Sequence, residues 1–108
     1  MALRVEVQPT VSAALDMAEL LSDRQQNLLR RNLRDNPMIG AASDDLGREY
    51  VFGAVTVFFI PVLDRDPARI IIWKVVRSDD PFIRDRRASR RRKKLGEYLR
   101  AILPWLRP

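Results

Sequence analysis

The sequence predicts an α+β fold, made of an N-terminal strand, a hairpin of two helices, a three-strand antiparallel meander and a C-terminal amphipathic helix. Three observations support this prediction. Apolar and polar residues alternate at the start of the chain, apolar residues recur at helical spacing from 11 to 33, and β-branched and aromatic residues crowd the stretch from 49 to 76. The chain has 108 residues, of which 46% are hydrophobic, so it has room for one core.

The first half of the chain is expected to form one strand and two helices. Alternation predicts a strand over residues 3–7, which a following proline ends. Apolar residues then recur at helical spacing over 11–21. Ser22 and Gln25 have the spacing of a capping box, which starts a second helix, and Pro37 stops that helix because the residue before a proline avoids the α region.

The middle of the chain is expected to form three strands, over residues 49–52, 54–62 and 70–76. Gly53 indicates a tight bend between the first two, and residues 64–67 give a turn signal that joins the last two into a hairpin. The sheet is therefore expected to be this antiparallel meander with the N-terminal strand added.

Both faces of the predicted hairpin are apolar. Two helices can cover only one face, so the second face needs another cover or is a binding surface for a partner. The residues proposed for partner binding on the sheet are Phe58, Ile60, Ile70, Ile72 and Lys74. Strict alternation along the strand would place Val75 and Trp73 on the other face of the sheet. Trp73 is most simply a core residue. Lys74 is either a functional cation facing the groove or, as we favour, a surface residue whose stem follows the strand while its ammonium reaches water.

Charge is distributed unevenly along the chain. Residues 81–108 contain ten Lys or Arg and two acids, a net of +8, whereas residues 1–80 carry a net of −2. Eight cations form one run, namely Arg84, Arg86, Arg87, Arg90, Arg91, Arg92, Lys93 and Lys94. We expect this run to bind nucleic acid or another polyanion, and the alternative is a solvated linker. Since no aromatic residue is interleaved, base stacking is not indicated.

The last residues have the pattern of an amphipathic helix. Asp80 and Pro81 give a helix start signal, and the apolar stripe consists of Leu95, Tyr98, Leu99, Ile102 and Leu103. Leu95, Leu99 and Ile102 are the candidate contact residues: the stripe either packs on its own sheet, dimerises or receives a partner. Residues 1–80 are thus expected to form an α+β domain, and 81–108 either belong to it or form an appended tail. A helix lying on a membrane surface is the least favoured alternative.

Composition excludes several kinds of site. The chain has no Cys and no His, which excludes disulfides, thiolate metal sites and Ser-His or Cys-His hydrolases. We expect no cofactor and no metal site, and Asp44-Asp45 is interpreted as loop charge. The start of the chain lacks the apolar block of a signal peptide, and the longest apolar run is too short to cross a bilayer. A cytoplasmic protein without a membrane partner is therefore the expectation.

The order of these elements resembles the RelE/ParE superfamily of toxins from bacterial toxin–antitoxin pairs, over residues 2–78. The segments that carry the resemblance are the strand at 3–7, the helix pair, the stretch from Leu33 to Gly40, and the hairpin of 55–59 with 70–77. The resemblance implies the α+β fold given above and a cytoplasmic toxin controlled by a cognate antitoxin.

Members of the superfamily that cleave mRNA on the ribosome use an Arg early in the long middle strand and a basic residue at the end of the last strand. This chain has Thr56 and Arg77 at the matching positions, and Arg48 lies nearest to the Lys residues that some members carry on the preceding strand. Arg77 and Arg48 are thus the catalytic candidates that the resemblance implies, in a depleted set. Because such sites act mainly by placing cations around a phosphate, ribonuclease activity stays open.

The resemblance implies a toxin that inhibits translation, through the ribosome and its mRNA, or DNA gyrase, and that acts by binding. The alternative is a non-catalytic regulatory protein that reuses the fold, encoded on a phage or mobile element, and binds nucleic acid or protein through its tail. An adjacent antitoxin gene would favour the first hypothesis and an orphan gene the second. The sequence does not specify an oligomeric state.

Overall fold

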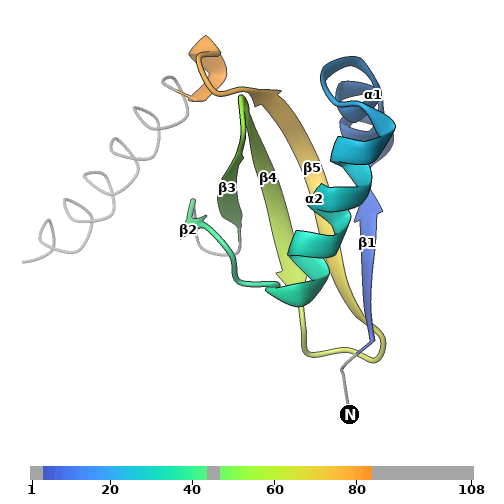
Figure 1. Cartoon of the computed structure of the whole chain (residues 1–108). Coiled ribbons are helices and arrows are strands. Elements are labelled where there is room, and N and C mark those ends of the chain that lie inside the picture. Colours follow the sequence, from blue (N-terminus) through green and yellow to red (C-terminus); the bar gives the residue numbers. More distant parts are fainter. Residues whose placement is uncertain (1–3, 44–46, 84–108) are drawn as a thin grey trace, which may run out of the picture. The chain divides into compact units, whose positions relative to one another are not determined.

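The computed structural model describes residues 4–43 and 47–83. The elements are β1 (Val5–Pro9), α1 (Val11–Leu20), α2 (Asp23–Asp35), β2 (Ala41–Ala42), β3 (Arg48–Phe52), β4 (Val55–Val62) and β5 (Ala68–Arg77) (Figure 1). The chain divides into two units, Met1–Ser78 and Asp79–Pro108. The first unit contains all of these elements and is a mixed α+β structure.

The sheet has five strands in the order β1-β5-β4-β3-β2. β3, β4 and β5 form the antiparallel meander, and β1 joins β5 in parallel, with Val5 opposite Ala68. The two-residue strand β2 was not expected from the sequence. It pairs with the start of β3 and extends the sheet at the edge opposite β1.

Side-chain caps begin both helices. Thr10 accepts a hydrogen bond from the backbone N–H of Ala13 (3.2 Å) at the start of α1. At the start of α2, Ser22 accepts from the N–H of Gln25 (3.2 Å), and the Gln25 side chain accepts from the N–H of Ser22 (2.9 Å). The predicted capping box is thus confirmed, and the reciprocal bonds satisfy two donors that the first turn leaves unpaired.

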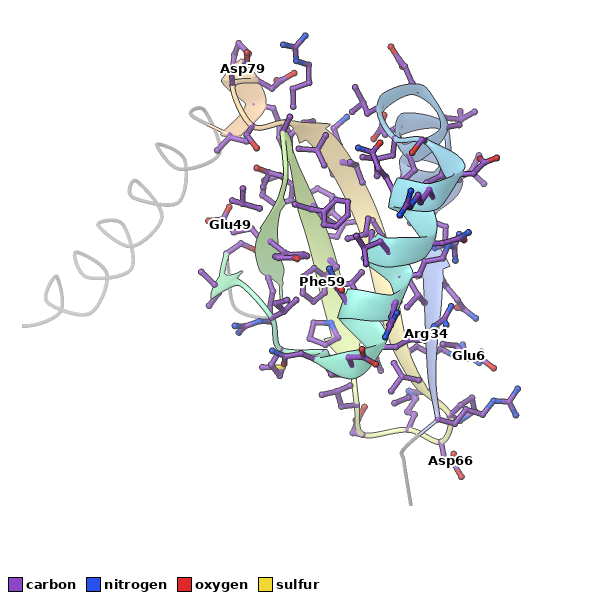
Figure 2. All side chains as sticks on the ribbon, viewed as in Figure 1. Glu6, Arg34, Glu49, Phe59, Asp66 and Asp79 are labelled. Atoms are coloured by element: carbon purple, nitrogen blue, oxygen red, sulfur yellow. The ribbon has the colours of Figure 1, made fainter. Side chains whose placement is uncertain are left out.

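The core lies between the helices and one face of the sheet. Both helices contribute fully buried residues to it, Ala13 and Met17 from α1 and Leu29 and Leu33 from α2. The sheet contributes Val55, Val57, Phe59, Ile70, Ile72 and Val75. Figure 2 shows Phe59 between the sheet and α2. A single apolar cluster thus accounts for the helix-covered face of the sheet.

A β-bulge in β5 changes which residues share a face. Phe58 is opposite Lys74 and Phe59 is opposite Ile72, which leaves Trp73 as an extra residue. Because of this insertion, Ile70 and Ile72 before the bulge and Val75 after it all lie on the helix-covered face. The assignment of Ile70 and Ile72 to the face of Phe58 is therefore wrong, as is the placement of Val75 opposite them.

The connection from α2 to the sheet depends on Gly40. Its φ of +84° is disfavoured for residues with a side chain, and a Cβ at this position would collide with the backbone carbonyl of Glu49. The guanidinium of Arg48 donates to the carbonyls of Ile39 (3.4 Å) and Gly40 (2.9 Å). These contacts hold the chain against the start of β3, where β2 forms.

In the second unit, residues 79–83 are described. The Asp80 side chain accepts a hydrogen bond from the N–H of Phe82 (2.8 Å), and its carbonyl accepts from the N–H of Ile83 (3.1 Å). These bonds have the pattern of a helix N-terminus with Asp80 as its cap.

Candidate functional site

The sheet face opposite the core cluster carries the remaining residues proposed for partner binding. Phe58 lies on this face and its ring is 5.5 Å from that of Trp73, but Phe58 is only 1% exposed. Ile60 is opposite Ile71, and both are half-buried. Val51, on the same face of β3, is 62% exposed. An incoming partner would therefore meet Val51 and Ile60 on this face, and Phe58 only after a rearrangement.

Lys74 lies at the edge of β5 that β1 leaves uncovered. The β1–β5 pairing stops at Ile72, whose carbonyl accepts from the N–H of Thr10 (2.8 Å). Beyond this point Asp16 of α1 approaches the strand, and its carboxylate accepts from the N–H of Val75 (3.3 Å). The Lys74 ammonium is 3.9 Å from the same carboxylate oxygen. Lys74 therefore belongs to a contact between helix and strand edge.

Asp16 was not identified from the sequence. The sequence offered one signal for it: Asp16 is an acidic residue next to Met17, in a stretch whose apolar spacing predicts a helix packed on the core. A carboxylate in that position has few backbone donors to bind except those at a strand edge. Asp16 thus substitutes for the missing strand partner of Val75.

Thr56, which the sequence resemblance aligned with a catalytic Arg of RelE/ParE ribonucleases, is engaged in a local contact. Its hydroxyl lies 3.0 Å from the hydroxyl of Ser78, and Thr56 is 3% exposed. Ser78 is held next to β4 by a hydrogen bond from its N–H to the carbonyl of Ala54 (2.9 Å). The two hydroxyls place neutral dipoles at this end of the sheet.

The two catalytic candidates are not brought together by the sheet. Arg48 pairs in register with Phe59 of β4, whereas Arg77 pairs with Val55, four residues away along that strand. Arg48 and Arg77 also lie on strands on opposite sides of β4. Because a strand rises about 3.3 Å per residue, their Cα atoms are more than about 13 Å apart. Arg48 is further committed to two backbone carbonyls. Arg77 is exposed at the end of β5.

The remaining site predictions lie outside the described residues. These are the cations of the basic run (Arg84, Arg86, Arg87, Arg90, Arg91, Arg92, Lys93 and Lys94), the apolar contacts Leu95, Leu99 and Ile102, and the loop acids Asp44 and Asp45. Within residues 4–43 and 47–83, no three Asp or Glu side chains form a group that could hold a metal ion. None of the helices in these residues is long and apolar enough to cross a membrane.

No family model, curated protein or solved structure matches this chain at a significant level.

Proposed function

We propose that this chain is a toxin-like protein of the RelE/ParE type that inhibits translation or DNA gyrase by binding, without cleaving RNA. The observation that carries the proposal is the surroundings of Thr56. At the position where the superfamily's ribonucleases place an Arg, this chain has a buried hydroxyl paired with Ser78. A neutral hydroxyl cannot supply the charge that such a site needs to stabilise a phosphate in its transition state.

The arrangement of the described elements supports the choice of superfamily. A strand, two helices, the short strand β2 and a three-strand meander follow one another, and apart from β2 this is the order on which the resemblance rests. Arg48 binds the turn at Ile39 and Gly40, which removes one of the two cations that a cleavage mechanism would use. The remaining candidate, Arg77, is a single cation. In this proposal a cognate antitoxin covers the sheet face that includes Val51 and Ile60.

Induction of the chain alone in bacteria tests this proposal. We expect growth arrest, no new mRNA cleavage sites, and either halted translation or a loss of DNA supercoiling. Arg77→Ala should still arrest growth, because the mechanism does not depend on a catalytic cation. Normal growth in the presence of folded protein would overturn the proposed toxin function, and mRNA cleavage that Arg77→Ala abolishes would overturn the binding mechanism.

The second candidate is a non-catalytic regulatory protein that binds nucleic acid or protein and is encoded on a phage or mobile element. The net charge of +8 over residues 81–108 favours it, since such a charge attracts a polyanion without any toxin activity. Nucleic-acid binding by a chain that leaves growth unchanged, from a gene without a neighbouring antitoxin gene, would support this candidate against the first.

A further inference from the structure

The outward side of α2 carries a row of three exposed arginines. Arg24, Arg31 and Arg34 are spaced seven and three residues apart, so they lie along one side of the helix. All three are exposed, and Leu29 and Leu33 on the opposite side are buried in the core. Since a helix rises about 1.5 Å per residue, the row is about 15 Å long.

Three other polar side chains of α2 make contacts within the protein. Arg30 donates to the carbonyl of Val7 (3.2 Å), Asn32 donates to the hydroxyl of Tyr50 (3.2 Å), and Gln26 donates to the carbonyls of Met17 (3.3 Å) and Leu21 (3.2 Å). These three side chains attach the helix to β1, to β3 and to the end of α1.

The outward arginines contrast with these three residues. Among the described residues, the side chains of Arg24 and Arg34 have no hydrogen bond and no ion pair. Arg34 lies near the C-terminal end of α2 (Figure 2). Arg31 is 3.9 Å from Asp35, with both side chains more than 70% exposed, a geometry that contributes little to stability. With four Arg and two Asp, α2 carries a net charge of +2.

We propose that this arginine face of α2, formed by Arg24, Arg31 and Arg34, binds the phosphodiester backbone of a nucleic-acid duplex. A duplex strand carries one phosphate per about 3.4 Å of helix axis, so a row of this length can follow several successive phosphates. The planar guanidinium matches phosphate oxygens in a bidentate manner. Because none of these residues is aromatic, the face is suited to the charged backbone and not to unstacked bases.

An anionic membrane is a poorer partner for this helix. A helix that lies on a membrane inserts its apolar side into the lipid, but the apolar side of α2 is occupied by the protein core. Leu28 is the one large apolar side chain exposed on α2, at 49%. The proposal is independent of the toxin hypothesis, since it concerns a surface that the sheet does not share.

The test uses the full chain with Arg24, Arg31 and Arg34 all changed to Gln, which removes charge and keeps helix propensity. The matched control changes Arg4, Arg65 and Arg69 to Gln; these are also exposed and lie outside α2. Binding to a mixed-sequence DNA duplex and to an RNA duplex is measured across a salt series. Both variants are also prepared with Arg90, Arg91 and Arg92 changed to Ala, so that the basic run does not mask the effect.

We expect the α2 variant to flatten the salt dependence. Each lost phosphate contact lowers the slope of log Kobs against log salt by about 0.9, so three contacts give about 2 to 3. The control variant should change the slope by less than about 1, because its three residues lie outside α2 and are not expected to contact the bound phosphates. Changing the same three residues of α2 to Lys should keep the slope near that of the natural chain and weaken affinity only modestly.

The proposal would be overturned by equal salt slopes in the α2 variant and the natural chain. It would also be overturned if the α2 variant and the control variant lowered the slope equally. Binding to vesicles of anionic lipid that exceeds binding to either duplex would overturn it as well. A circular dichroism spectrum that shows loss of helix would direct the test to Arg31→Gln alone, which removes the central cation of the face. That single change must lower the slope by about 1 for the proposal to stand.

Discussion

Leu28 and Leu29 are adjacent on α2, yet Leu29 is fully buried in the core and Leu28 is 49% exposed. The difference follows from the helical repeat, because a step of one residue rotates the side chain by about a quarter of a turn. Leu29 faces the sheet and Leu28 faces solvent. Because the two residues are of the same type, a difference between their substitutions reports the contribution of burial to stability.

Leu29→Ala should lower the free energy of unfolding by about 2–5 kcal/mol, because it removes buried apolar volume and leaves a cavity. Leu28→Ala should change it by less than about 1 kcal/mol, since much of that side chain is already in water. Urea denaturation of both variants checks the expectation. Equal destabilisation by the two substitutions would contradict the placement of α2 on the sheet.

Asp16 provides the second test at the scale of single residues. Asp16→Ala removes the acceptor of the Val75 N–H and the neighbour of the Lys74 ammonium, and we expect a loss of about 1–3 kcal/mol. Lys74→Met should cost less than about 1 kcal/mol, because the ion pair is long, at 3.9 Å, both side chains are still partly in water, and the stem is kept. A larger loss in Lys74→Met than in Asp16→Ala would show that the ion pair, and not the strand-edge hydrogen bond, stabilises the contact.

At the scale of elements, the sequence predicted both helices and the three strands of the meander because their signals are local. The capping box at Ser22 and the run of β-branched and aromatic residues in β4 each depend on residues close together in the chain. The bulge at Trp73 could not be predicted, because it is defined by pairing with β4 and leaves no mark in the pattern of β5 alone. β2 was missed since it forms where Gly40 and Arg48 hold two residues against β3.

The turn between α2 and β2 can be tested with its glycine. Gly40→Ala should be severely destabilising, because its φ is positive and the new Cβ would collide with the Glu49 carbonyl. Gly53 is the matched control: its φ of +58° is also positive, but a Cβ there meets nothing within 4 Å. Gly53→Ala should therefore cost only about 1 kcal/mol, the strain of a left-handed conformation. Thermal unfolding of the two variants measures the difference, and equal losses would contradict the close approach at Gly40.

At the scale of the whole molecule, the candidate site was only partly predictable. The excess of positive charge after residue 80 is evident from composition. The composition does not show which arginines make contacts within the fold. Arg48 and Arg30 bind backbone carbonyls of segments that only the tertiary structure brings near them. The distinction between cations used for folding and cations left for a partner therefore appears only in the structure.

The basic run supplies the prediction at this scale. Replacing Arg90, Arg91 and Arg92 with Ala should weaken binding to nucleic acid and flatten its slope against salt by up to about 2.7, if each contacts one phosphate. Titrations of the natural and variant chains at several salt concentrations check this. The fold of the first unit should be retained, since these positions lie beyond Ser78. An unchanged slope would contradict a role for the run in polyanion binding.

The parallel pairing of β1 with β5 has a consequence for folding. Each hairpin of the meander joins neighbours in sequence, whereas Val5 must find Ala68, more than sixty residues further along the chain. Closing so long a loop costs more conformational entropy than closing a hairpin, so the meander is expected to form before β1 arrives. Until then the outer edge of β5 is unpaired and can recruit a strand from another molecule. Removal of the first nine residues should therefore promote aggregation, because it leaves this edge of β5 permanently unpaired.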